Sequence, residues 1–146
     1  MPKTARALST LPQVDYADAF VVETGPAKEW TCEEWARAML EGAPAIMRTA
    51  LLSAWFALGL RLGSNPSDRF VLGWEVRRST SDYSLLGAGS RVGMPAELLF
   101  KRRRRTLLYA TFVRHENPIS RAVWAGIAPG HRQVVRYALE QAAALT

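Results

Sequence analysis

Hydrophobic and polar residues alternate through the middle of the chain, whereas on either side the hydrophobic residues recur with helical spacing. The alternation predicts four consecutive strands over residues 69–116, and a β-favouring run at residues 16–24 predicts one more strand. The order of elements is therefore strand, helices, sheet and C-terminal helix. We expect an α+β fold in which an antiparallel sheet packs around the C-terminal helix and leaves a pocket between them.

Two helices are predicted between residues 31 and 62. Thr31 and Glu34 have the spacing of a capping box at the start of the first helix, Trp30 is placed to act as its hydrophobic staple, and Gly42 ends it. Pro44 suits the first turn of the second helix, which we expect to continue to residue 62. Because the second helix is apolar on nearly every side, we expect it to be buried on several faces; the alternative is a surface presented to lipid or ligand.

The alternation also assigns an inward face to each predicted strand of the sheet. The inward sets are Phe70, Leu72, Trp74 and Val76, then Tyr83, Leu85, Gly87 and Gly89, then Met94, Ala96, Leu98 and Phe100. For the last strand we favour Leu107, Tyr109, Thr111, Val113 and His115, because the competing set contains Arg114, which is easier to leave in water. Gly87 and Gly89 have little to pack, which is typical of a bend or of the close approach of another group.

The C-terminal region is predicted to be helical in two parts. Asn117 and Pro118 supply an N-cap and a first-turn proline. We expect Ala128-Pro129-Gly130 to interrupt this helix before a longer amphipathic helix resumes. The apolar stripe of the longer helix consists of Val134, Val135, Ala138, Leu139, Ala142 and Leu145.

Length and composition favour one domain in a reducing compartment. The 146 residues, 49% of them hydrophobic, suit a single domain at 15–146 after a flexible tail at 1–14 that lacks the apolar core of a secretory signal. The single cysteine, Cys32, excludes an intramolecular disulfide and zinc-ligand spacing, so we expect a cytoplasmic protein with an inert, partly buried thiol. The longest uncharged stretch of the helical region, residues 49–60, is well short of the ~20 residues that span a bilayer.

The net charge of +6 is unevenly distributed. Residues 15–41 hold seven acidic against two basic residues, whereas residues 69–116 hold ten basic against four acidic ones. Five consecutive basic residues, 101–105, lie between two predicted strands, where we expect a solvated hairpin tip. An anionic membrane, an acidic partner or nucleic acid are alternatives for this run, but no aromatic residues interleave with it, so we expect no specific nucleic-acid binding.

Three short motifs carry a resemblance to a known family. Leu72-Gly73-Trp74, Thr111-Phe112-Val113-Arg114, and Trp124 followed by His131-Arg132 resemble an uncharacterised bacterial family of the helix-grip (SRPBCC) superfamily. That superfamily also holds START-type lipid-transfer domains, plant pathogenesis-related proteins and polyketide aromatase/cyclases. The resemblance covers most of the chain from about Tyr16 onward. It implies a curved antiparallel sheet gripping the C-terminal helix, with more strands than the five predicted here and a cavity for an apolar or amphipathic molecule, but no particular activity.

The chain carries no sequence motif of a known catalytic, cofactor or metal site. It has no nucleophile elbow, phosphate-binding loop, dinucleotide fingerprint or metal-spaced His/Cys cluster, so we expect neither a cofactor nor a metal. His131 is either a hydrogen-bonded core residue or a general base or polar anchor at the pocket mouth, and His115 is a further candidate. Asp15 and Asp18 fall on opposite faces of a strand and are expected to be solvated.

The aromatic residues on inward faces suggest the walls of a binding site. Tyr83 and Tyr109 are either ordinary core tyrosines or groups that orient a ligand hydroxyl or carbonyl. The candidate ligand-binding residues are Trp35, Trp55, Trp74, Tyr83, Leu98, Phe100, Tyr109, His115 and His131. The predicted function is binding of a hydrophobic or amphipathic small molecule, the alternative being a small aromatase/cyclase- or isomerase-type enzyme using the same cavity. The sequence also allows a second copy of the chain as a partner, in a homodimer.

Overall fold

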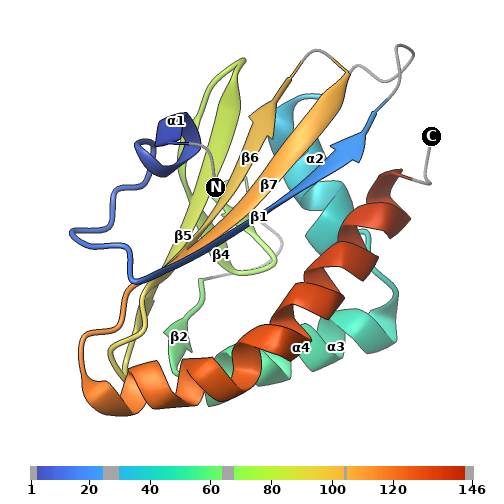
Figure 1. Cartoon of the computed structure of the whole chain (residues 1–146). Helices are drawn as coiled ribbons and strands as arrows, with labels where there is room; N and C mark the ends of the chain where they lie inside the picture. Colours follow the sequence, from blue (N-terminus) through green and yellow to red (C-terminus); the bar gives the residue numbers. More distant parts are fainter. Residues whose placement is uncertain (1–2, 25–29, 64–67, 104, 144–146) are drawn as a thin grey trace.

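The computed structural model describes residues 3–24, 30–63, 68–103 and 105–143. Its helices are α1 (Lys3–Arg6), α2 (Cys32–Leu40), α3 (Ala45–Ala57) and α4 (Pro118–Ala143). Its strands are β1 (Tyr16–Glu23), β2 (Leu60–Arg61), β3 (Phe70–Val71), β4 (Trp74–Ser79), β5 (Tyr83–Ser90), β6 (Ala96–Arg102) and β7 (Thr106–Val113). Helices α2, α3 and α4 lie on one side of the sheet and α1 lies on the other (Figure 1).

The strands form one open antiparallel sheet. Their order is β1-β7-β6-β5-β4-β3, and β2 pairs with β5 beside this path. The first strand thus returns to lie next to the last one, and α4 packs across the face of the sheet that we call inner. The α+β class and the antiparallel sheet on a C-terminal helix are confirmed, and the arrangement is compatible with a helix-grip fold.

The described sheet has seven strands, two more than the residue pattern predicts. Leu72 and Gly73 have left-handed backbone angles (φ 46° and 92°), and the tight turn they make divides one predicted strand into β3 and β4. The second predicted helix ends at Ala57, not at residue 62, because Gly59 is also left-handed (φ 73°). Leu60 then pairs with Ser90 to form β2.

The expectation that the apolar second helix is buried on several faces is wrong. No described residue of α3 is buried, and Ile46 and Phe56 expose 87% and 74% of their surface. Only the strip containing Leu51 and Trp55 packs against the core. The composition of a helix shows how much apolar surface it could bury, but not how many other elements pack around that helix in the fold.

The N-terminus of α2 has the capping box and the hydrophobic staple that the sequence predicts. The Thr31 hydroxyl accepts a hydrogen bond from the Glu34 amide at 3.1 Å, and the Glu34 carboxylate accepts one from the Thr31 amide at 3.0 Å. The rings of Trp30 and Trp35 meet edge to face at 4.8 Å, as a hydrophobic staple requires. Cys32 is buried, and this burial raises the pKa of its thiol, in agreement with an inert cysteine.

Helix α4 runs without the expected interruption from Pro118 to Ala143. The Asn117 side chain caps it by accepting a hydrogen bond from the Ser120 amide at 2.8 Å. Pro129 lies on the exposed side of the helix, where water can satisfy the carbonyl that loses its partner. Trp124 before the proline and Val135 after it are both buried against the inner face, so packing holds the two halves in line.

Strand pairing decides which residues face inward. Phe100 pairs with Tyr109, and both belong to the inner core, so the favoured phase of β7 is confirmed. The predicted phase of β5 is wrong: Leu86 pairs with Leu98 on the inner face, which turns Tyr83 and Leu85 to the outer face. Because β5 has glycines at alternate positions, its apolar pattern is too weak to show from the sequence which of its two faces points inward.

The N-terminal residues expected to form a flexible tail pack on the outer face of the sheet. Ala5 is fully buried there, and Leu8, Leu11 and Val14 pack against the same cluster. This outer core is built by Leu85, Leu99, Leu108, Ala110 and Phe112. An outer face this apolar needs a cover, and the N-terminal segment supplies it.

Glu97 fastens that segment to the sheet. Its carboxylate is fully buried on the outer face and accepts hydrogen bonds from the Ser9 hydroxyl (2.5 Å) and from the amide (3.0 Å) and hydroxyl of Thr10. Arg77 donates to it at 3.2 Å, and the guanidinium lies so close to Gly87 that any side chain there would clash with it. Of the two alternatives expected at this glycine, a bend or a close approach, the close approach is present and is made by Arg77.

We predict that Glu97→Ala destabilises the protein by about 3 kcal/mol, because it leaves the Arg77 charge and two hydroxyl donors without their acceptor. Glu75→Ala is the matched control: Glu75 also pairs with Arg77, at 3.5 Å, but its side chain is 49% exposed. We expect this control to cost less than about 1 kcal/mol. Urea denaturation followed by tryptophan fluorescence measures both; equal losses in the two variants would contradict the role given to Glu97.

Candidate functional site

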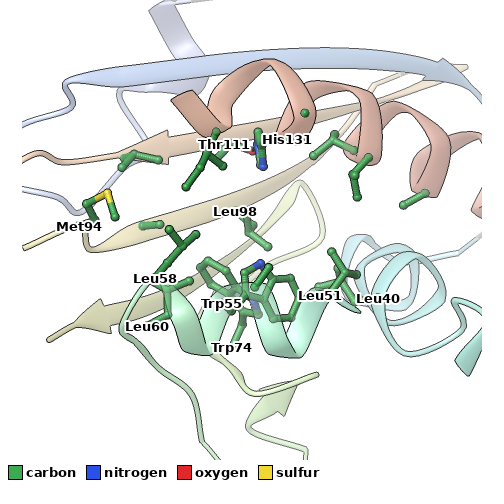
Figure 2. Close-up of a pocket in the computed structure, with 18 of the residues that line it drawn as sticks. Leu40, Leu51, Trp55, Leu58, Leu60, Trp74, Met94, Leu98, Thr111 and His131 are labelled. Atoms are coloured by element: carbon green, nitrogen blue, oxygen red, sulfur yellow. Dashed lines mark hydrogen bonds between the residues drawn. The ribbon is translucent and has the colours of Figure 1, made fainter. Parts of the chain in front are cut away.

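A cavity of about 280 Å³ lies between the inner face of the sheet and helices α3 and α4. Figure 2 shows side chains from these elements converging on it. Its lining residues are Met39, Leu40, Leu51, Ala54, Trp55, Leu58, Leu60, Trp74, Met94, Ala96, Leu98, Tyr109, Thr111, Val113, Trp124, Ile127, Gly130, His131, Val134, Val135 and Ala138. The walls are almost entirely apolar, and the volume is near the lower end for small-molecule sites.

Large aromatic side chains give the cavity stiff walls. Trp55 of α3 and Trp74 of β4 meet edge to face at 5.5 Å and line the side nearest α3. Trp124 of α4 lines the opposite side, where it contacts Tyr16 edge to face at 5.1 Å. Interlocked rings of this kind lose little conformational freedom when a ligand packs on them, which favours binding.

The cavity opens between α3 and α4. Ala54 on α3 and Val134 on α4 both line it and both reach solvent. Leu51, Leu58 and Ile127 lie partly exposed on the same walls. A molecule can therefore enter beside α3 without opening the sheet.

Polar groups are concentrated at one wall, where α4 crosses β7. His131 Nε2 lies 3.2 Å from the Thr111 hydroxyl, and that hydroxyl donates to the Tyr109 phenol oxygen at 3.0 Å. All three residues line the cavity. The His131 ring also lies against Trp124, with centroids 5.1 Å apart.

Asp18 extends this polar wall away from the cavity. Its Oδ2 lies 3.5 Å from His131 Nε2 and accepts a hydrogen bond from the Tyr16 phenol at 2.6 Å. Arg132 donates in turn to the Tyr16 oxygen at 3.2 Å. The Asp18 side chain is only 9% exposed, so the expectation of a solvated carboxylate is wrong. Pairing of Asp18 with Thr111 across β1 and β7 places it beneath α4.

Asp15 was likewise expected to be solvated and is likewise covered, with 6% of its side chain exposed. Its carboxylate accepts a hydrogen bond from the His115 amide at 2.7 Å, and this bond is the main cause that lowers the pKa of Asp15. His115 itself follows the end of β7 and does not line the cavity; burial lowers the pKa of its imidazole. Asp15 therefore ties the start of β1 to the end of β7.

The surroundings of the two tyrosines keep both phenols protonated. Burial, followed by the hydrogen bond to Asp18, raises the pKa of Tyr16 from 10.0 to about 12. Complete burial raises the pKa of Tyr109 as well. Both hydroxyls therefore stay neutral at ordinary pH.

The structure brings five of the nine predicted ligand-binding residues to the cavity: Trp55, Trp74, Leu98, Tyr109 and His131. Trp35 and Phe100 are buried in the same core but do not line it. Tyr83 lies on the outer face, and His115 lies beyond the strand end. Sequence reasoning missed Asp18 and Tyr16 as site residues, because their link to α4 depends on which strand β1 pairs with.

The described residues contain no group of three or more His, Cys, Asp or Glu side chains placed to hold a metal ion. Within that same part of the chain, no helix combines the length and apolarity needed to cross a membrane. No protein-family model, curated protein or solved structure matches this chain. The site is therefore interpreted from its own chemistry.

The raised pKa of Tyr16 predicts a loss of stability at alkaline pH. As pH rises, the unfolded chain releases the phenol proton near 10.0 and the folded chain only near 12, so the stabilisation is complete below pH 10 and is lost between these values. We expect the free energy of unfolding to fall less steeply over this range in Tyr16→Phe than in the wild type. Urea denaturation at stepped pH measures the slopes.

Tyr137→Phe is the matched control for this titration, because Tyr137 is half exposed on α4 and lies outside the polar wall. We expect its slope to equal that of the wild type. Tyr109 is present in all three proteins and does not affect the comparison. Equal slopes for the wild type and Tyr16→Phe would show that neither burial nor the Asp18 contact holds the phenol protonated.

Proposed function

We propose that this protein binds a hydrophobic or amphipathic small molecule in the cavity between the sheet and α4. The observation that carries the proposal is an open, apolar cavity of about 280 Å³ whose hydroxyl and imidazole groups are gathered at one wall. Burying apolar ligand surface supplies affinity, and a few fixed polar groups supply orientation. The resemblance to the helix-grip superfamily supports the same function, and we propose membership of that superfamily.

An amphipathic ligand suits the two ends of the cavity. Its apolar body would pack against Trp55 and Trp74, and a hydroxyl or carbonyl group would face Thr111 and His131. The neighbouring Asp18 carboxylate disfavours a carboxylate ligand at that wall, since two like charges in a poorly hydrated site repel. We also propose a cytoplasmic setting, which the free, buried Cys32 supports.

A bulky side chain at the cavity mouth tests the proposal. Ala54→Trp is expected to weaken binding of the fluorescent probe N-phenyl-1-naphthylamine about tenfold or more, because the indole would occupy the entrance. Ala50→Trp is the matched control: Ala50 is an exposed alanine one turn earlier on α3 and does not line the cavity. Fluorescence titration measures both affinities. Solvent extraction of the natively purified protein, followed by mass spectrometry, identifies any resident ligand.

Two results would contradict binding in this cavity. One is the absence of both probe binding and any extracted molecule in the wild type. The other is an equal loss of probe affinity in the Ala54→Trp and Ala50→Trp variants, which would place the probe on the surface of α3.

A second candidate function is catalysis of the aromatase/cyclase or isomerase type. The contact between His131 and Asp18 favours it, because a carboxylate beside an imidazole supports proton transfer at the cavity wall. Holding a flexible substrate between rigid indoles would supply much of the remaining acceleration.

For this second function we expect His131→Ala to abolish conversion of the extracted molecule while leaving the affinity for N-phenyl-1-naphthylamine within about threefold of the wild type. Conversion is followed by chromatography and mass spectrometry, and circular dichroism checks the fold. Unchanged conversion in His131→Ala would exclude His131 as the proton-transfer group. A parallel loss of conversion, affinity and folding would assign it a structural role.

A further inference from the structure

The outer face of α3 is an uncharged surface exposed to solvent. Its exposed residues are Ala45, Ile46, Thr49, Ala50, Leu52, Ser53, Ala54, Phe56 and Ala57, and none of them is charged. A helix on the surface of a globular protein ordinarily carries charged residues on its solvent side. Large exposed side chains such as Ile46 and Phe56, gathered on such a face, mark an interaction site.

The apolar surface continues from the end of α3 to the start of α4. The Arg91 amide donates to the Gly59 carbonyl at 2.7 Å, and the Asn117 side chain donates to the Val92 carbonyl at 3.1 Å, so the 91–93 turn joins the two helices. Val92 is 49% exposed and Ile119 is 77% exposed. In Figure 1, α3 and the first half of α4 lie along the same end of the molecule, away from the hairpin between β6 and β7.

On α4 this surface leads to the cavity. Ile119, Val123, Ile127, Gly130 and Val134 follow one another at three- and four-residue steps and therefore share one side of the helix. The last three line the cavity and the first two are exposed. We call Ile46, Leu52, Phe56, Val92, Ile119 and Val123 the mouth surface, because they lie on the two helices between which the cavity opens and on the 91–93 turn that joins them.

The charges around the mouth surface are mainly basic. The exposed Glu116, whose amide donates to the Gly93 carbonyl of the 91–93 turn, is paired with Arg114 at 3.6 Å. No acidic residue occurs from position 42 to position 67. Arg61 and Arg91 are exposed and make no ion pair with any described residue. Arg121, between Ile119 and Val123, is 66% exposed, and its ion pair with Asp15 is long, at 3.8 Å. Its guanidinium is therefore largely accessible to solvent. An anionic surface would meet both apolar and basic groups here.

We propose that the mouth surface docks on an anionic lipid bilayer. Phe56 and Ile46 enter the interfacial region, while Arg61 and Arg91 meet the phosphate-bearing headgroups. A second copy of the chain fits less well, because residues 42–67 contain arginines but no acidic residue, so a two-fold contact through α3 itself offers no ion pair between the copies. This inference concerns the outer surface and stands whether or not the cavity holds a ligand.

Vesicle co-sedimentation tests the apolar part of the proposal. The wild type is expected to bind mixed phosphatidylcholine–phosphatidylglycerol vesicles, and Ile46→Ser/Phe56→Ser to reduce the partition coefficient about tenfold or more. Because both side chains are already exposed, this variant should fold normally. Val21→Ser/Tyr137→Ser removes two other exposed apolar residues, which lie outside the mouth surface, and is expected to stay within about twofold of the wild type.

A second pair of variants tests the charges. Arg61→Gln/Arg91→Gln is expected to remove most of the preference for phosphatidylglycerol over pure phosphatidylcholine vesicles, whereas Arg102→Gln/Arg103→Gln in the β6–β7 hairpin is expected to keep it. Three results overturn the proposal: no vesicle binding by the wild type, loss of binding only in the hairpin variant, or a wild-type dimer in light scattering that Ile46→Ser/Phe56→Ser converts to monomer.

Discussion

The pairing of β1 with β7 is the contact on which the remainder of the structure depends. It joins the first strand to the last one, with Asp18 opposite Thr111, and so brings Tyr16 and Asp18 to the side chains of α4. The same pairing draws the N-terminal segment back across the outer face, where Glu97 holds it. A slip of one residue would move Asp18 to the outer core and an alanine to the polar wall. The register of one strand pair thus fixes both the covering of the sheet and the chemistry of the cavity.

The cavity exists because α4 and α3 cover the sheet unequally. Helix α4 presses Trp124, Val135 and Leu139 onto the inner face. Helix α3 touches the core with a single strip, and its outer side has no neighbour among the described elements. Space therefore remains between the two helices, and Trp55 and Trp74 are too bulky and too firmly interlocked to collapse into it. The exposed face of α3 and the open cavity are two consequences of the same incomplete cover.

Local signals in the sequence predicted local structure well. The capping box at Thr31 and the phase of β7, chosen because Arg114 is hard to bury, are both confirmed. The division of β3 from β4 was missed, since a left-handed Leu72 has no signature in an apolar run. The burial of α3 and of Asp18 was misjudged because each depends on elements distant in sequence. For the same reason only part of the site was predicted correctly. Inward strand residues such as Leu98 do line the cavity, whereas Tyr83 does not, because the predicted phase of β5 was wrong.

Two carboxylates that are shielded from solvent, Glu97 and Asp18, differ in how completely their hydrogen bonds are satisfied. Glu97, on the outer face, is satisfied by two hydroxyls, an amide and Arg77, as a purely structural ion must be. Asp18 lies beside the cavity, where its Oδ2 accepts a hydrogen bond from the Tyr16 phenol and lies 3.5 Å from His131 Nε2. Its Oδ1 has no hydrogen-bond partner among the described residues. A folding core gains nothing from a carboxylate left partly unsatisfied, and such groups in native proteins concentrate at functional sites. This difference between the two carboxylates supports the proposal that a ligand's polar group faces the wall where His131 meets Thr111 and Asp18.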